Sequence, residues 1–191
     1  MDTKNFNIVD RLIAKMRLSK VLPHVEKGDV VLDFGCGNQG FFLNYVSPVI
    51  KKGVGIDYDV DNKTNSNLLF KKFIFENRLP FKDESFDKVI MLAVLEHVET
   101  NKVELLFKEF KRILKKNGKV ILTTPTPLSK PILEFLAYKL RIISECEIRD
   151  HKKYYTRNDI KELAEATNFL LDSYKLFQFG LNSSAILEKN N

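Results

Sequence analysis

Three glycines that follow a short apolar run could shape a ligand-binding turn. In the stretch "VVLDFGCGNQG" the glycines Gly35, Gly37 and Gly40 have the spacing G-x-G-x-x-G, which is typical of a loop that approaches the phosphates of a dinucleotide. Asp33 lies two residues before the first of these glycines. Its carboxylate would repel a nearby pyrophosphate, because like charges a few ångströms apart repel even when partly screened. The pattern therefore favours a ligand that carries positive charge near Asp33.

S-adenosylmethionine meets this requirement on charge. It joins a nucleoside to an amino acid whose ammonium and sulfonium groups are cationic, and its carboxylate can face the backbone amides of the helix after the glycines. The stretch "VVLDFGCGNQG" resembles the first motif of the class I, Rossmann-like S-adenosylmethionine-dependent methyltransferases. The resemblance covers roughly residues 27 to 170 and is nearest to the small-molecule branch that includes ubiquinone-pathway O-methyltransferases.

The resemblance implies which residues would contact the cofactor. Asp57, in "GVGIDYD" and 22 residues beyond Gly35, corresponds to the acid that binds both ribose hydroxyls, and its two oxygens suit a vicinal diol. Many relatives carry an aspartate for the adenine amino group where this chain has Phe75, so that role passes to Glu76 or Asn77. The expected cofactor contacts are Asp33, Gly35, the backbone of Cys36, Gly37, Asp57, Tyr58 against the adenine, Glu76, Asn77, and Leu92 and Ala93 along the methionine arm.

Histidines and tyrosines are the expected acceptor residues. His97, in "LEHV" after the fourth strand, is the candidate catalytic base because an imidazole titrates near neutral pH; a hydrogen-bonded structural histidine is the alternative. The stretch "DHKKYYTRNDIKELAEATNF" resembles the family's later segment, in which a histidine and an aromatic residue precede a capped helix. It implies acceptor contacts from His151, Tyr154 and Tyr155.

The cysteines and the motifs that the sequence lacks disfavour metal, disulfide and DNA-methylating sites. Cys36 and Cys146 form no C-x-x-C pair, so neither a disulfide framework nor a zinc site is expected, and no metal is predicted. His24 is expected to be structural. The chain has no D/N-P-P-Y/F motif and no Pro-Cys pair, which disfavours amino-methylating DNA enzymes and pyrimidine-attacking ones.

The expected function is transfer of a methyl group from S-adenosylmethionine to an oxygen or nitrogen of a small-molecule acceptor, leaving S-adenosylhomocysteine. Two alternatives stay open. A nicotinamide-dependent oxidoreductase is supported by the glycine spacing and the later acid but opposed by Asp33 and by the lack of a substrate domain. The second alternative is a non-catalytic protein that binds S-adenosylmethionine and acts as a partner of another protein.

The elements that must position these residues alternate along the chain. Helical spacing of apolar residues predicts helices over residues 5 to 19, from Thr100 to a stop at Asn117–Gly118, and around Ile132 to Ile143. "TRND" resembles a capping box that opens a last helix. Strands are expected at "VVLDF", "GVGIDYD", "LLFKKFIF", "SFDKVIMLAV", "KVILTTP", "FLLDSYKLFQF" and "LNSSAILE". This order predicts an α/β, doubly wound, mostly parallel seven-stranded sheet with helices on both faces and an antiparallel C-terminal hairpin.

Length and composition agree with one ordinary globular domain. The chain has 191 residues, 44% hydrophobic and 29% charged, enough for one core. We expect an N-terminal helix over residues 1–22, a cofactor-binding core over 27–128, a helical acceptor segment over 129–170 and terminal strands over 170–191. The net charge of +6 is interleaved with acids, so nucleic acid is not the expected partner. No apolar run is long enough to span a membrane, which predicts a cytoplasmic protein.

Overall fold

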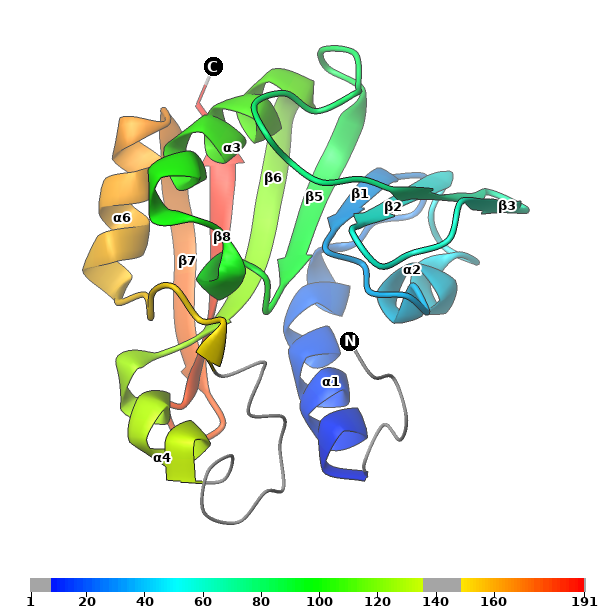
Figure 1. The fold of residues 1–191 in the computed structure, drawn as a ribbon. Helices are drawn as coiled ribbons and strands as arrows, with labels where there is room; N and C mark the ends of the chain where they lie inside the picture. Colours follow the sequence, from blue (N-terminus) through cyan, green and yellow to red (C-terminus); the bar gives the residue numbers. More distant parts are fainter. Residues whose placement is uncertain (1–7, 136–148, 191) are drawn as a thin grey trace.

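A mixed sheet of eight strands runs through the molecule in the order β3-β4-β2-β1-β5-β6-β8-β7 (Figure 1). The computed structural model describes residues 8–135 and 149–190, with side chains from residue 13 onward. The strands are β1 (Val30–Phe34), β2 (Lys52–Asp57), β3 (Lys63–Asn65), β4 (Leu68–Lys72), β5 (Phe86–Leu92), β6 (Leu114–Pro125), β7 (Phe169–Phe177) and β8 (Asn182–Lys189).

The five central strands β4, β2, β1, β5 and β6 are parallel, and β3, β8 and β7 are antiparallel to their neighbours. The predicted doubly wound sheet with an antiparallel C-terminal hairpin is confirmed. The strand order reverses at β1, which lies between β2 and β5. In such sheets a ligand binds beyond the carboxyl ends of the strands at the reversal point.

The eighth strand, β3, is the difference from the seven predicted. It forms in the polar stretch after β2, where all three of its residues are exposed, and it pairs antiparallel with β4. Ser66, with a φ of 51°, turns the chain between the two strands. This polar stretch offers no apolar stripe with which a helix could pack against the sheet, so it extends the sheet edge instead.

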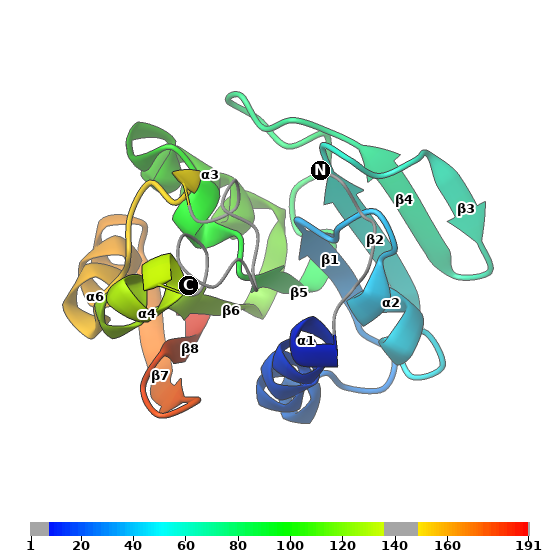
Figure 2. The ribbon, with the colours of Figure 1, turned by 60° about the horizontal axis from the view of Figure 1, so that its bottom comes forward.

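Helices cover both faces of the sheet (Figure 2). Val31, Ile90 and Ile121 pack with helices α1 and α2, whereas Leu32 and Val89 pack with α3 and α6. Successive strand residues point to opposite faces, and the central parallel strands are therefore apolar on both. The helices are α1 (Ile8–Val21), α2 (Phe41–Val46), α3 (Thr100–Ile113), α4 (Lys130–Glu134) and α6 (Arg157–Ala166), with 3-10 turns η1 (Leu22–His24), η2 (Leu95–His97) and η3 (Pro127–Ser129).

Two predicted helix ends are corrected. Thr100 is the first residue of α3 rather than its cap, because Glu99 precedes the helix and makes no side-chain capping bond. The helix ends at Ile113, before the predicted stop at Asn117–Gly118. Asn117, with a φ of 61°, lies instead in the irregular start of β6, where the register with β5 shifts. The last part of the helix predicted around residues 132 to 143 lies outside the described residues.

No helix within residues 8–135 and 149–190 is both long and apolar enough to cross a lipid bilayer.

The predicted capping box at the start of α6 is confirmed. The Asp159 backbone N–H donates to Thr156 Oγ1 at 3.2 Å, and the Thr156 N–H donates to Asp159 Oδ2 at 2.8 Å. Burial alone would raise the pKa of Asp159, but hydrogen bonds from Lys153 and Thr156 outweigh it and lower the pKa to about 2. The two residues thus satisfy backbone donors that would otherwise lack a partner at the helix end.

Replacing the cap should weaken the fold measurably. Thr156→Ala is expected to lower the free energy of unfolding by about 1 kcal/mol, because it removes the side-chain acceptor of the capping box. Urea denaturation followed by circular dichroism measures the change. Thr100→Ala is the matched control and should stay within about 0.5 kcal/mol, since Thr100 caps nothing. Equal effects of the two substitutions would contradict the capping assignment.

Candidate functional site

The carboxyl ends of β1, β2 and β5 lie side by side and bring the predicted cofactor residues together. Asp33 of β1 stands beside Gly55 of β2 and Ile90 of β5. Beyond β1 the chain turns back toward β2, because the N–H groups of Gly35 and Cys36 both donate to the Ile56 carbonyl, at 2.8 and 3.2 Å. The glycine turn is therefore fixed to the end of β2.

Asp57 strengthens this attachment through its side chain. The Gly37 N–H donates to Asp57 Oδ2 at 2.9 Å, and the Asp59 N–H donates to Asp57 Oδ1 at 2.9 Å. Both carboxylate oxygens are thus oriented by the backbone. Because each carboxylate oxygen can accept more than one hydrogen bond, Asp57 is still able to accept from the two hydroxyls of a ribose.

Glycine is required in the turn for two different reasons. Gly35 has a φ of 79°, and a Cβ atom there would lie 2.3 Å from Val94 Cγ2. The backbone of β1 and the segment after β5 therefore approach closely. Gly37 has a φ of 65°, but no heavy atom lies within 4 Å of the position of its Cβ. Gly37 faces open space that a side chain would fill, as expected for a backbone that cradles a ligand.

Asp33 is a buried acid on β1, close enough to Asp57 to feel its charge. Its side chain is 2% exposed. Burial, and then the nearby negative charge of Asp57, raise the pKa of Asp33 to about 8. A positive charge beside such a carboxyl would lower its pKa again by stabilising the anion. A cationic ligand beside Asp33 would therefore favour its charged form, whereas an anionic ligand would keep it protonated.

Cys36 shows no sign of chemical reactivity. Burial, followed by the charges of Asp33 and Asp57, raises the pKa of its thiol, so the reactive thiolate is disfavoured. Its Sγ instead donates weakly to the Gly37 carbonyl at 3.4 Å.

The remaining predicted cofactor residues follow the ends of β2, β4 and β5 in the sequence. Tyr58 follows Asp57 and is 54% exposed, and Glu76 and Asn77 are exposed. Phe75 instead packs its ring edge against Phe34, with 6.4 Å between ring centroids. Leu92 and Ala93 are half-buried at the end of β5, and Ala93 has a φ of 54°.

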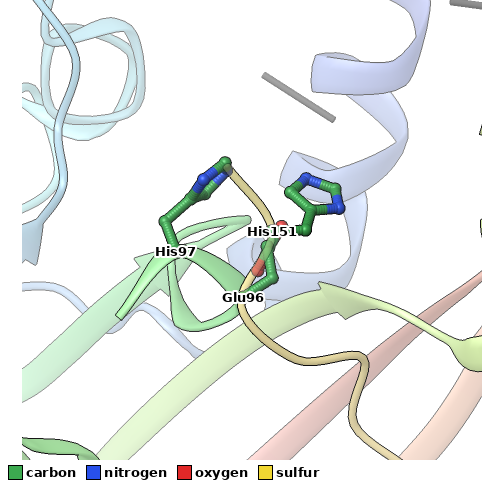
Figure 3. Close-up of side chains that lie close together, drawn as sticks. All are labelled: Glu96, His97 and His151. Carbon is green, nitrogen blue, oxygen red and sulfur yellow. The ribbon is translucent and has the colours of Figure 1, made fainter. Parts of the chain in front are cut away.

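A second group of polar side chains lies just after β5 (Figure 3). Glu96 and His97 belong to η2, and His151 comes from the segment before α6. The two segments are joined by a hydrogen bond of 2.7 Å from the Lys152 N–H to the Glu96 carbonyl. His97 and His151 meet edge to face, with 4.8 Å between ring centroids.

Each of these three side chains has a specific partner. Glu96 is 1% exposed and accepts a hydrogen bond of 3.1 Å from Thr124 Oγ1. His97 Nδ1 lies 3.3 Å from Asp150 Oδ2, and His151 Nδ1 lies 3.0 Å from Tyr154 Oη. Burial raises the pKa of Glu96. Burial, and then the charge of His97, lower the pKa of His151 to about 4.

The predicted acceptor residues thus divide into two sets. His151 and Tyr154 are hydrogen-bonded to each other beside His97. Tyr155 is 3% exposed and packs in the core with α3 and α6. His24 lies apart on η1, and burial lowers its pKa.

Sequence reasoning missed the partners Asp150 and Thr124. Asp150 directly precedes His151 in the stretch "RDHKKYY", and this spacing is the signal that could have drawn attention to it. Thr124 is the second threonine of "LTTP", a pattern that also suits an ordinary buried strand.

Comparison with known proteins agrees with the fold. Residues 4–174 match the family model described as "Methyltransferase domain". Because this match covers most of the chain, the protein belongs to the class I, Rossmann-like methyltransferases.

Two relatives by sequence illustrate the family. "Uncharacterized protein MJ0638" of Methanocaldococcus jannaschii is 31% identical over 180 residues, which are 89% of this chain and 66% of that protein. A human protein named "Probable tRNA methyltransferase 9B" is 31% identical over 111 residues, 56% of this chain and 23% of the human one. The chain spans no more than 66% of the length of either relative.

A solved structure shows the same fold. It is the 1,6-didemethyltoxoflavin-N1-methyltransferase of Burkholderia thailandensis with bound 1,6-didemethyltoxoflavin and S-adenosylhomocysteine. Its TM-score is 0.72 at 14% identity, over 96% of this chain and 80% of that one. At this identity the similarity establishes the fold alone.

Removing the Asp33 carboxyl should change how stability depends on pH. With a folded-state pKa of about 8 against an ordinary value of 3.8, Asp33 stays protonated in the folded chain while the unfolded chain loses its proton. Wild-type stability therefore falls as the pH rises from about 4 to 8. As the pH rises from 5 to 8, the free energy of unfolding of Asp33→Asn should rise relative to that of the wild type. The expected rise is at least about 1.4 kcal/mol, the equivalent of one pKa unit.

Urea denaturation at several pH values in this interval measures the effect. Asp61→Asn, which replaces an exposed acid near the end of β2, is the control for a general change in net charge. Parallel stability curves for the wild type and Asp33→Asn would contradict the assigned environment of Asp33.

Proposed function

We propose that the protein transfers a methyl group from S-adenosylmethionine to an oxygen or nitrogen atom of a small-molecule acceptor. The observation that carries this proposal is the pair of neighbouring acids, Asp33 and Asp57. Asp57 accepts a hydrogen bond from Gly37, whose missing side chain leaves open space. Membership of the methyltransferase family supports it. The Burkholderia enzyme of the same fold, with S-adenosylhomocysteine and a small molecule bound, is a further analogy.

The chain offers groups that suit each part of this cofactor. Asp57 would accept from the ribose hydroxyls, and Asp33 would face the cationic amino-acid end. Tyr58 would pack on the adenine, with Glu76 or Asn77 near its amino group. Gly35, Gly37 and the Cys36 backbone would pass beneath the cofactor, and Leu92 and Ala93 would line its methionine arm. When bound, S-adenosylmethionine supplies a methyl group already activated by its sulfonium.

The work left to the protein is mainly to align the acceptor and exclude water. His97 is the proposed general base for an acceptor that must lose a proton. Its bond to Asp150 would orient the ring. His151 and Tyr154 would contact the acceptor from the segment before α6. Tyr155 was expected to do the same, but its ring is buried in the core.

Transfer to RNA is the second candidate for the acceptor. The human relative named as a tRNA methyltransferase and the net charge of +6 favour it. Many of the basic side chains are paired with acids, however, such as Lys119 with Glu188 and Lys115 with Asp87. This pairing reduces the charge available to phosphates, so the small-molecule acceptor is preferred.

Ligand binding separates the cofactor proposal from its alternatives. Isothermal titration calorimetry should show binding of S-adenosylhomocysteine and none of NAD. Asp57→Ala should weaken S-adenosylhomocysteine binding by at least about tenfold, about 1.4 kcal/mol, because two hydrogen bonds to the ribose are lost. The control Asp61→Ala should leave the affinity unchanged. Tight binding of NAD without a response to S-adenosylhomocysteine would overturn the proposal in favour of an oxidoreductase.

Activity tests the acceptor class. With a labelled methyl donor, label should appear in small molecules of a cell extract from which macromolecules have been removed. Label in the RNA fraction alone would favour the RNA acceptor. Cofactor binding without transfer to any fraction would instead favour a non-catalytic binding protein.

A further inference from the structure

Glu96, His97 and His151 place metal-binding atoms close together (Figure 3). We propose that these three side chains bind one divalent first-row transition metal ion beside the acceptor site. This differs from the expectation from sequence, which included no metal. One carboxylate oxygen and one nitrogen from each imidazole lie within 4.8 Å of one another. The residues come from two segments 54 positions apart, so their spacing in the sequence carries no metal-binding motif.

The ligand atoms must come closer together to hold one ion. A tetrahedral ion with bonds of about 2.0–2.2 Å holds its ligand atoms roughly 3.4 Å apart. Side-chain rotations would have to close the difference from 4.8 Å. The hydrogen bond from the Lys152 N–H to the Glu96 carbonyl already holds the two backbones together. The segments need not move relative to each other.

The hydrogen bonds around the three side chains are compatible with a metal site. Histidines that bind metals usually use their second nitrogen to bond a carboxylate or another polar group, which fixes the ring. Here His97 Nδ1 is bonded to Asp150, and His151 Nδ1 to Tyr154. Coordination would therefore use Nε2 of both rings. Glu96 is oriented in the same way by Thr124.

The charges around the site are mixed. Two carboxylates, Glu96 and Asp150, favour a cation. Arg17 of α1 acts electrostatically on both Glu96 and His151, and its positive charge disfavours a cation there. Lys152 pairs with Asp150 at 2.9 Å. A cation bound to such a site must be held by direct coordination rather than by net charge, which favours ions that bind imidazole strongly.

The donor set indicates the class of ion. Imidazole suits zinc, iron, nickel and copper, whereas magnesium and calcium prefer oxygen ligands. Two histidines and one carboxylate leave at least one coordination position for another ligand. A role for this open position rests on the proposed function. An oxygen of the acceptor would occupy the position, and the metal would lower the pKa of the acceptor hydroxyl. His97 would then be a ligand rather than the general base, since its free nitrogen is coordinated.

Metal binding can be measured without cofactor or acceptor. Untagged full-length protein is first freed of metal with a chelator and then titrated with Zn²⁺ by calorimetry. We expect one Zn²⁺ per chain. His97→Ala and His151→Ala should each weaken binding by at least about 100-fold, and Asp150→Asn by about 10–100-fold. His24→Ala removes the remaining histidine of the chain and should leave the affinity unchanged.

Further measurements keep the result interpretable. Circular dichroism checks that each variant folds; if His151→Ala does not, His97→Ala and Asp150→Asn decide the outcome. Absence of stoichiometric Zn²⁺ binding to the folded wild type would overturn the proposal, and so would equal binding by His97→Ala and wild type. Binding of S-adenosylhomocysteine is measured separately and should be unchanged in His97→Ala, so that loss of the metal site is distinguished from loss of the cofactor site.

Discussion

The hydrogen bond between the Asp57 carboxylate and the Gly37 amide holds together the part of the molecule on which the rest of the site depends. It joins the turn after β1 to the end of β2, alongside the two bonds that the Ile56 carbonyl accepts from that turn. Positive φ angles at Gly35 and Gly37 make this geometry possible. The backbone therefore holds the turn in place without a ligand, and a preformed turn would reduce the entropy lost when the proposed cofactor binds.

The same turn connects the proposed cofactor side of the site to the proposed acceptor side. Gly35 packs so closely on Val94 that no side chain fits between them, and Val94 stands two residues before Glu96. The segment after β5 is thus positioned by the glycine turn, and η2 then presents Glu96 and His97 toward His151. Burial of Asp33 disfavours its charged form in this arrangement, as is common where a buried group serves a binding site rather than stability.

Much of the fold could be predicted from local pattern, whereas the polar contacts between distant segments could not. The apolar runs that became β1, β2, β5 and β6 and the capping box at Thr156 were visible in the sequence. The end of α3 was misplaced because Asn117 and Gly118 serve the start of β6 rather than the helix. Glu96 and His151 are 55 residues apart in the sequence and meet only in the folded chain, so one sequence does not reveal their contact. The cofactor residues were named by resemblance, and their roles stay predictions.

The central claim is that the open space at Gly37 receives the cofactor, and a comparison of two glycines tests it most directly. Gly37 and Gly28 both have positive φ angles and nothing within 4 Å of an added Cβ, so alanine at either costs about 1–2 kcal/mol of backbone strain. Calorimetry should show that Gly37→Ala loses at least about tenfold in affinity for S-adenosylhomocysteine, while Gly28→Ala binds as the wild type does. Unchanged affinity in a folded Gly37→Ala protein would contradict the account.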